Sequence, residues 1–435
     1  MQVSVEKKEG IHCVLNIELS ASEVDQEVSK RIKKIAKTAK IDGFRPGKVP
    51  AGVIKKKYGE QIRFEVLGDV LPQKYTKAIQ DENLNAAGVE IEITQNEEGK
   101  EVKFNVDVEL FPEIEVKNLD QIEVEKPVVE LGQEQTDKMI DNLRKQLASW
   151  DVVDREVQKD DRVTIDFVGR VNGEVFEGGS ANDSEVTIGS GQMIPGFEDG
   201  IIGMKKDEEK TIKVTFPEDY QNEELNGKEA EFDIVVKEIK AATLPEIDEE
   251  FIKQFGIKGG VDEFYAEITQ NMARELKAAK QRKTKEQVFE GLKKAIDVEV
   301  PKALVKKEID RLKKDLLKRL GGNGAKLKIE DLPDNLFEEK AKDSVKLGLI
   351  LSAIADQQSF EADQESIDAL IEEMASVYED AEEVRQHVKN NKQELENIKA
   401  VVIENKLVDW VLEQAKVTEK EEDFFELVRN TMPSS

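Results

Sequence analysis

A helical pattern runs from Pro245 to the C-terminus almost without interruption, and it is the strongest constraint on the fold. Narrow apolar stripes recur at helical spacing and are flanked by Lys and Glu, which is typical of thin, well-solvated helices rather than of one thick core. The predicted helices cover roughly residues 262–296, 304–320, 334–357, 364–378, 380–390, 393–416 and 419–430. Because 435 residues exceed what one core supports, the helical part is expected to be one domain among several.

The first 111 residues are predicted to fold as an α+β domain. Apolar and polar residues alternate over 11–19 and again over 102–110, as they do in half-buried strands. Ser20 and Glu23 stand three residues apart, which is the spacing of a capping box at the start of a helix. Apolar residues then recur at helical spacing up to Ala39, so a helix is expected between the two strands.

Residues 151–243 have a different character, with short β-rich runs separated by glycine-rich turns. The runs cover 163–168, 185–188, 211–216 and 230–239, and they predict a compact antiparallel β domain. An acidic connector with Pro112 and Pro127 leads into this domain and is followed by a short amphipathic helix at about 133–150. The chain is therefore predicted to be a multidomain α+β protein, divided into 1–111, 112–149, 150–243 and 244–435.

The charge of the chain is unevenly distributed. The net charge is −28, yet segment 30–63 has twelve Lys or Arg against Asp42 and Glu60, so this segment carries +10 and the remainder carries −38. A basic segment on an acidic protein indicates one defined site for a polyanionic partner. A nucleic-acid-binding protein would also use such a segment, but the acidic remainder disfavours wrapping along nucleic acid.

The sequence offers little for a cofactor, a metal or a membrane. The longest apolar run, 347–355, is far shorter than the roughly 20 residues that span a bilayer, and the first twenty residues contain no continuous apolar stretch. Cys13 is the single cysteine, and His12 and His387 are the two histidines, so no disulfide framework and no histidine-based metal site are expected. These features predict a cytoplasmic protein without a cofactor or a membrane partner.

A series of motifs follows in order through the β domain. The motifs are Val163–Gly169, Gly173–Glu177, Ile188–Gly200 with the run Ile194-Pro195-Gly196-Phe197, Val214–Tyr220 and Ala230–Ile234. Over about 90 residues their order and spacing resemble the FKBP-type peptidyl-prolyl isomerases. The resemblance implies an FKBP-like antiparallel fold that catalyses cis-trans isomerisation of X-Pro bonds.

This reaction needs few reactive groups. Rotation about an X-Pro bond crosses a barrier of about 18–20 kcal/mol, and the twisted transition state is less charge-separated than the planar amide. An apolar cradle that removes water, with a donor to the carbonyl oxygen, therefore favours the twisted form. The resemblance assigns this site to Phe167, Phe176, Glu177, Met193, Ile194, Phe197, Tyr220 and Phe232. It implies the backbone N–H of Ile194 and the hydroxyl of Tyr220 as hydrogen-bond donors.

Two positions depart from the small FKBP isomerases. Phe197 stands where these enzymes often have Trp, and Glu177 stands where they usually have Asp. The resemblance therefore implies isomerase activity but leaves macrolide binding open. The alternative interpretation is that the aromatic residues only form the core of a small β domain.

A basic loop follows the first predicted helix. Gly43, Phe44, Arg45 and Lys48 in this loop resemble the ribosome-docking signature of the trigger factors, which are ribosome-associated chaperones with a central FKBP-type domain. The resemblance implies docking on the large ribosomal subunit at the tunnel exit, with Phe44 in a protein pocket and the cations on rRNA phosphate or an acidic side chain. The alternative is an ordinary solvated basic helix followed by a turn.

The helices after Pro245 contain no catalytic constellation and the chain has no phosphate-cradling motif, so no ATP requirement is expected. The same resemblance implies helical arms around a cradle for nascent and unfolded polypeptides, with segment 112–149 packed against them, and it is compatible with a homodimer off the ribosome. Met374, Tyr378 and the Phe424-Phe425 pair are candidate client contacts, although packing between helices is the simpler interpretation of each. An isomerase whose flanking domains are only scaffolding is the remaining alternative.

Overall fold

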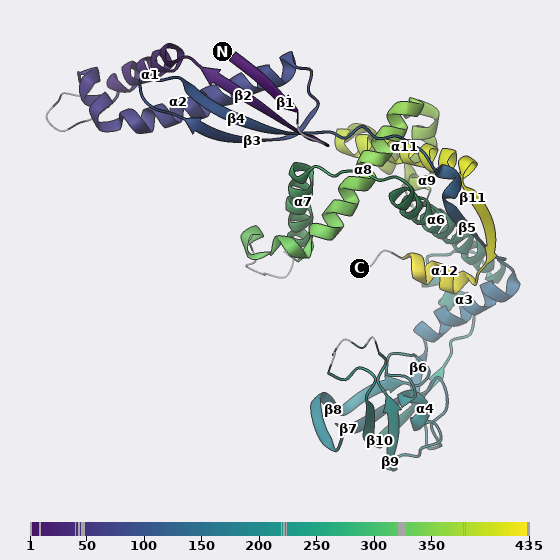
Figure 1. The fold of residues 1–435 in the computed structure, drawn as a ribbon. Helices are drawn as coiled ribbons and strands as arrows, with labels where there is room; N and C mark the ends of the chain where they lie inside the picture. The colour runs from purple at the N-terminus through teal and green to yellow at the C-terminus, as the bar shows by residue number, and fades with distance from the viewer. Residues whose placement is uncertain are drawn as a thin grey trace. The chain divides into compact units, whose positions relative to one another are not determined.

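The computed structural model describes residues 2–7, 10–39, 41, 44, 48–218, 220, 222, 224–320, 328–376, 378 and 380–432, without the side chain of Glu177 (Figure 1). The chain divides into two compact units, one made of Met1–Pro127 with Arg282–Lys420 and the other of Val128–Gln281 with Glu421–Ser435. An N-terminal α+β domain, an antiparallel β domain and a helical C-terminal part are all present, so the predicted fold class is confirmed.

The N-terminal domain is a four-stranded antiparallel sheet with two helices packed on one face. Strands β1 (Gln2–Lys7), β2 (His12–Leu19), β3 (Ala86–Gln95) and β4 (Val102–Leu110) lie in the order β1-β2-β4-β3, and helices α1 (Ala21–Ala36) and α2 (Ala51–Asp81) follow β2. The predicted alternation is confirmed, because Leu15 and Ile17 of β2 and Phe104 and Val106 of β4 are buried in one core with the helices. Removing this sheet face from water is the main driving force for the domain.

Two features of this domain differ from the sequence prediction. The helix α1 starts after Ser20 as expected, but the side chain of Ser20 caps no backbone N–H, so the predicted capping box does not form. The Glu23 carboxylate instead accepts a hydrogen bond from Lys74 of α2, which lowers the pKa of Glu23. No helix was predicted at α2, a 31-residue helix with Pro72 in its interior, although its buried residues Ile62, Val66 and Leu71 recur at helical spacing.

The connector and the C-terminal helices of the first unit contain a second core, and a smaller separate cluster forms between α7 and α8. Their elements are η1 (Leu119–Gln121), β5 (Glu123–Val128), the later part of α6 (Val261–Ala295), α7 (Lys302–Leu320), η3 (Ile329–Asp331), η4 (Asp334–Leu336), α8 (Glu338–Gln358), α11 (Lys392–Gln414) and β11 (Lys416–Glu421). Ile122 and Val124 of the connector are buried against Leu292 of α6 and Val411 of α11. Gly291 permits this close approach, because a Cβ there would collide with the side chain of Ile122.

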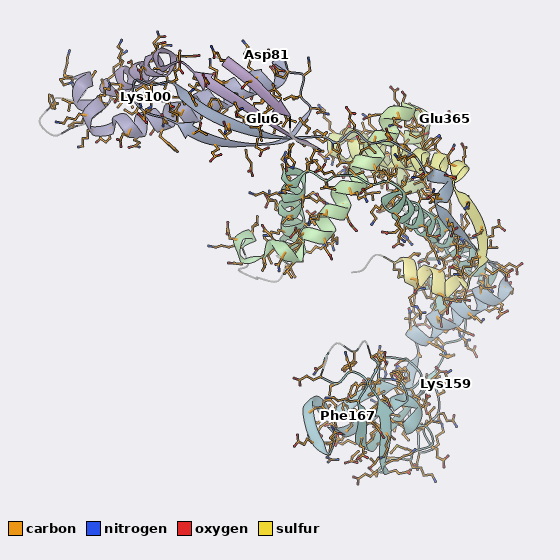
Figure 2. All side chains as sticks on the ribbon, viewed as in Figure 1. Glu6, Asp81, Lys100, Lys159, Phe167 and Glu365 are labelled. Atoms are coloured by element: carbon orange, nitrogen blue, oxygen red, sulfur yellow. The ribbon has the colours of Figure 1, made fainter. Side chains whose placement is uncertain are left out.

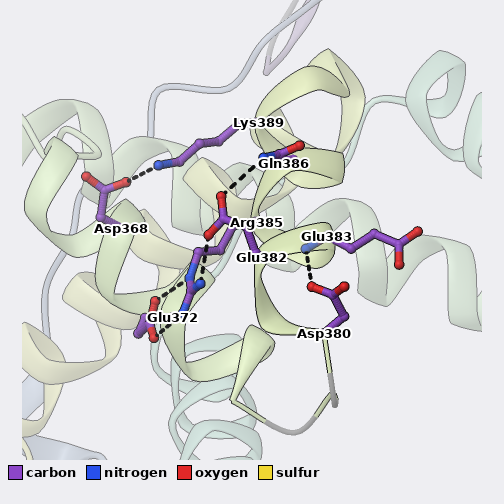
Figure 3. A network of polar contacts seen from close by, with 8 residues as sticks. All are labelled: Asp368, Glu372, Asp380, Glu382, Glu383, Arg385, Gln386 and Lys389. Carbon is purple, nitrogen blue, oxygen red and sulfur yellow. Dashed lines mark hydrogen bonds and ion pairs between the residues drawn. The ribbon is translucent and has the colours of Figure 1, made fainter.

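A helical arm, called here the α9–α11 arm, is formed by α9 (Gln364–Ala375), α10 (Ala381–Asn390) and the first half of α11. Its core consists of five buried residues, Ile367, Ile371, Val388, Ile398 and Val402. Polar contacts also join α9 and α10 (Figure 3). Arg385 of α10 donates to both carboxylate oxygens of Glu372 on α9, each at 2.7 Å, and to Glu382 at 3.0 Å. Lys389 faces Asp368 across the same pair of helices at 3.6 Å.

The second unit contains the β domain and a helical cluster beside it. Its elements are α3 (Gln133–Gln146), β6 (Ser149–Val152), β7 (Arg162–Val171), β8 (Glu174–Thr187), α4 (Phe197–Ile201), β9 (Glu209–Thr215), β10 (Glu229–Thr243), α5 (Glu249–Lys253), the first part of α6 and α12 (Phe424–Thr431). The sheet order is β6-β10-β7-β8, and β9 also pairs with β10. All pairings are antiparallel, as predicted. Ile140, Phe251, Phe264 and Phe424 form the core of the helical cluster.

Two predicted helix boundaries are wrong. The helix expected at 133–150 ends at Gln146, and Trp150 belongs to β6, where it pairs with Ala242 of β10. The helix expected at 419–430 begins only at Phe424, since Lys416–Glu421 form β11 beside β5. No helix in the described part of the chain is long and apolar enough to cross a membrane.

Candidate active site and binding surfaces

Four phenylalanines from separate elements meet in the β domain. Phe167 comes from β7, Phe176 from β8, Phe197 from α4 and Phe232 from β10 (Phe167 is labelled in Figure 2). The ring centroids of Phe197 and Phe232 are 5.1 Å apart, and those of Phe167 and Phe197 are 5.6 Å apart. Phe176 lies 6.1 Å from Phe232. These three pairs are edge-to-face, which the quadrupoles of the rings favour.

The aromatic cluster has a buried base and an exposed rim. Phe197 is fully buried at 0% exposure, and Phe232 is buried as well. Phe167 and Phe176 are only partly buried, and so are Met193 and Ile194 in the loop before α4; all four pack against the core cluster. Tyr220 is 37% exposed. The structure therefore brings together seven of the eight predicted site residues, while the side chain of Glu177 lies outside the described part of the molecule.

Phe216 belongs to this cluster and was not among the predicted site residues. Its ring lies 5.7 Å from Phe176 and 4.8 Å from Tyr220, so it links the exposed tyrosine to the other rings. A signal for it was present in the sequence. Ile212, Val214 and Phe216 alternate along β9 and its end, and all three are buried.

Two glycines allow the rings to lie close to the sheet. A Cβ on Gly169 of β7 would lie 2.5 Å from the Phe232 ring, and a Cβ on Gly179 of β8 would lie 2.7 Å from the Phe176 ring. Real Cβ atoms do not approach other heavy atoms so closely, so any larger residue would push a ring out of the cluster. The rings of Phe232 and Phe176 can therefore keep these positions only if residues 169 and 179 are glycine.

The loop that carries Met193 is held by a buried carboxylate, that of Glu198 in α4. It accepts hydrogen bonds from the backbone N–H groups of Gly189, Gly191, Gln192 and Met193 and from the hydroxyl of Ser190. Burial raises the pKa of Glu198, but these hydrogen bonds outweigh burial and hold the pKa below the usual value of a glutamate. Glu198 is therefore a carboxylate at neutral pH.

The predicted docking loop is described only in part. Phe44 is 40% exposed and Lys48 is exposed, whereas Gly43 and Arg45 lie outside the described residues.

One of the cations counted in the +10 segment has a structural role and not a binding role. Arg63 of α2 is buried and donates to Asn96 at 2.7 Å and to Asp25 at 3.2 Å, so its charge is not presented to a partner.

The candidate client contacts fall into two groups. Tyr378, 61% exposed, and Met374 present large apolar surfaces to solvent at the end of α9. Phe424 is buried in the core of the helical cluster, and Phe425 is partly buried against the same core. Packing is thus the role of Phe424, as the simpler interpretation held, while the two residues near α9 remain available for binding.

Among the described residues, no group of three His, Cys, Asp or Glu side chains is placed to hold a metal ion.

The antiparallel β domain with its ring cluster defines a class of enzyme. Residues 153–237 match the family described as FKBP-type peptidyl-prolyl cis-trans isomerase. Residues 1–143 match the family described as bacterial trigger factor protein, and residues 260–413 match the C-terminus of that same protein.

Full-length relatives agree with these matches. A trigger factor from Francisella philomiragia is 59% identical over 432 residues, covering 99% of this chain and 98% of the relative. A trigger factor from Marinobacter nauticus is 45% identical over 436 residues, covering 100% of both chains. The chain therefore belongs to the trigger factor family, and it is a chaperone with an FKBP-type peptidyl-prolyl cis-trans isomerase domain.

Proposed function

We propose that this chaperone docks at the exit of the large ribosomal subunit, binds nascent and unfolded polypeptides and isomerises their X-Pro bonds, in the cytoplasm and without ATP. Membership of the trigger factor family supports binding to ribosomes and nascent chains. We assign one role to each predicted domain. Residues 1–111 would dock on the ribosome, 150–243 would isomerise X-Pro bonds and 244–435 would bind clients. Residues 112–149 form a connector that packs on the C-terminal helices.

The proposed isomerase site is the aromatic cluster of the β domain. Phe197 and Phe232 form an apolar base that excludes water, and the proline ring of a client would lie on them between Phe167 and Phe176. Desolvation of the imide favours the twisted transition state, which is less polar than the planar ground state. The single observation that carries this proposal is the exposed rim. A cluster that served only as a core would enclose its rings, whereas here four apolar side chains are only partly buried and gather beside Tyr220, which is exposed.

Two donors are proposed to bind the carbonyl oxygen of the client. The hydroxyl of Tyr220 stands at the rim, where its ring packs 4.8 Å from that of Phe216. The backbone N–H of Ile194 belongs to the loop beside the buried base. A hydrogen bond from either donor would hold the carbonyl while the C–N bond rotates, and no proton transfer or covalent step is needed.

The isomerase proposal is tested with Phe176→Ala, because Phe176 is partly exposed and its loss leaves the buried base in place. The catalytic efficiency on a short X-Pro peptide should fall at least about tenfold, which corresponds to about 1.4 kcal/mol of lost transition-state stabilisation. Val175→Ala, at an exposed neighbouring position of β8, is the matched control and should retain full activity. Wild-type activity in folded Phe176→Ala would contradict the proposed site.

Docking is proposed to use Phe44 as an apolar anchor in a ribosomal protein, with cations around it on rRNA phosphate. Lys33, Lys34 and Lys37 near the end of α1 are exposed and add a salt-sensitive attraction. The combined variant Phe44→Ala, Arg45→Ala and Lys48→Ala should lose co-sedimentation with large subunits. Phe64→Ala with Lys77→Ala, an exposed pair on α2 of the same domain, is the control and should still bind. Unchanged co-sedimentation of the loop variant would contradict the docking proposal.

A homodimer off the ribosome is proposed as a second state. The +10 segment and the acidic remainder of the chain are complementary in charge, which supports contact between two copies. Sedimentation velocity should then show a dimer at low salt that dissociates as salt increases. A single monomeric species at every salt and protein concentration would exclude this state.

A further inference from the structure

The carboxylate of Glu198 is an unusual centre of hydrogen bonding beside the aromatic cluster. Its Oε2 atom accepts from the N–H of Gly189 at 2.7 Å and of Gly191 at 3.1 Å. Its Oε1 atom accepts from the N–H of Gln192 at 3.1 Å and of Met193 at 3.2 Å, and from the hydroxyl of Ser190 at 3.1 Å. Glu198 is 7% exposed, although the residues 189–192 that donate to it lie at the surface.

All five donors come from the run 189–193, which joins β8 to α4 and belongs to no strand or helix. Backbone N–H groups outside helices and strands need other acceptors. Four N–H groups of this run find them in the two oxygen atoms of one carboxylate, that of Glu198. Gly189 and Gly191 have φ angles of +88° and +70°, which let successive N–H groups turn toward the same carboxylate. The conformation of the run therefore depends on a single negative charge.

The end of this run is where the proposed site begins. The last bound amide belongs to Met193, and in the described part of the chain no acceptor receives a hydrogen bond from the next amide, that of Ile194. The carbonyl of Ile194 accepts from the N–H of Phe197 at 3.0 Å, which ties this residue to the first turn of α4. Phe197 and Glu198 are neighbours on that turn, one at the base of the ring cluster and the other under the run.

We propose that Glu198 is a positioning residue for isomerisation. Its carboxylate gathers the amides of 189–193, and this places Met193 at the rim and leaves the N–H of Ile194 as the next donor, free for the carbonyl oxygen of a client. The first turn of α4 therefore positions two parts of the site. Phe197 forms the apolar base, and Glu198 orients the loop that carries the N–H donor of Ile194. This role rests on the proposed isomerase site and adds to it the group that orients the donor.

The test uses the full-length chain with Glu198→Gln, which keeps the shape of the side chain but replaces one acceptor oxygen by an NH₂ group that faces N–H donors. Catalytic efficiency on an X-Pro peptide should fall about tenfold or more. Amide hydrogen exchange at 189–194 should accelerate by a similar factor, while exchange in β7 and β10 stays at the wild-type rate. Asp199→Asn removes the same charge at the next, exposed position and should change neither quantity.

The variant Glu198→Asp tests whether Glu198 positions the loop for catalysis or only stabilises the β domain. The shorter carboxylate still accepts several of the amides, so this variant should recover part of the activity and part of the exchange protection together. Full activity in folded Glu198→Gln would overturn the proposal, and so would faster exchange throughout β7 and β10, because the residue would then only stabilise the domain. Phe176→Ala distinguishes failure of the positioning role from failure of the proposed isomerase site. If Phe176→Ala is inactive and Glu198→Gln is active, only the positioning role of Glu198 is wrong. If both variants are active, the proposed isomerase site is wrong as well.

Discussion

The β domain and the α9–α11 arm hold their shapes by different means. Among the described residues, the core of the β domain has seventeen that are buried and apolar, including Phe197, Phe216 and Phe232, and it extends over every strand from β7 to β10. The core of the arm has five buried residues, and its helices are also joined by ion pairs such as Arg385 with Glu372 (Figure 3). Packed rings fix atoms to within a narrow range, whereas exposed ion pairs contribute little and exchange readily with water.

This difference fits the two tasks proposed for these regions. Isomerisation needs rings and donors at fixed positions, since a displacement of about 1 Å removes much of the benefit of a preorganised site. Binding of varied unfolded clients needs apolar surface on an element that can adjust, and the arm presents Met374 and Tyr378 beside a small core. The β domain is thus expected to respond sharply to changes in packing, and the arm to changes in charge.

The largest effect is expected for Phe197→Ala. Truncation of a fully buried ring should lower the free energy of unfolding of the β domain by about 3–5 kcal/mol and abolish isomerase activity. Suppression of client aggregation should persist, because the helical part is unchanged. Denaturant unfolding followed by Trp150 fluorescence in a Trp410→Phe background reports on the β domain alone. An unfolding midpoint equal to that of wild type would show that this ring does not support the domain.

The next effect concerns added rather than removed volume. Gly169→Ala places a methyl group against the Phe232 ring and should cost about 1–3 kcal/mol of stability together with much of the isomerase activity. Gly348→Ala in α8 is the matched comparison, because a Cβ there meets no atom within 4 Å. It should stabilise the helical part by about 0.5–1 kcal/mol. If both changes had the same sign, the contrast between the enclosed Gly169 of the β domain and the open Gly348 of α8 would be wrong.

A smaller effect is expected from acid. Hydrogen bonds from Lys406 and Ser366 hold the pKa of Asp363 well below its usual range, and Arg385 lowers the pKa of Glu372. Carboxylates with depressed folded pKa values contribute stability above their ordinary pKa of about 4, and this contribution is lost as pH falls through the folded values. Asp166 of β7 and Asp233 of β10 also have lowered pKa values, but these strands are held by a much larger apolar core than the arm. Amide exchange corrected for intrinsic rates should therefore show α9 and α10 losing protection before β7 and β10. Simultaneous loss in both regions would contradict this order.

The smallest effect is expected for Arg385→Met, which removes the contacts to Glu372 and Glu382 from a partly exposed site. Exchange in α9 and α10 should rise slightly in dilute salt, and the difference from wild type should vanish at about 1 M salt, where charges are screened within about 3 Å. Lys399→Met removes a single pair with Glu396 within α11 and serves as the control. A difference that persists at high salt would mean that Arg385 acts through packing of its stem.

Local pattern was enough to predict the elements that have one face in water and one in a core. Alternation identified β2 and β4, and helical spacing identified α6 to α11 within a few residues. These features depend on periods of two and 3.6 residues, which are properties of the chain itself and do not require knowledge of the partner surface. The seven rim and base residues that the structure brings together were named by the resemblance to the FKBP-type isomerases and not by a period.

Other features were decided only by contacts between distant segments. Glu23 was available to cap its own helix, but Lys74 of α2 takes its carboxylate. The segment 416–421 is exposed throughout and polar except for Val417, and it becomes a strand because β5 offers backbone partners. No local pattern predicts burial of Glu198, which stands beside Asp199, and it is buried because the amides of 189–193 converge on it. In each case the outcome depends on which hydrogen-bonding group arrives from elsewhere in the chain, and only the tertiary structure supplies that information.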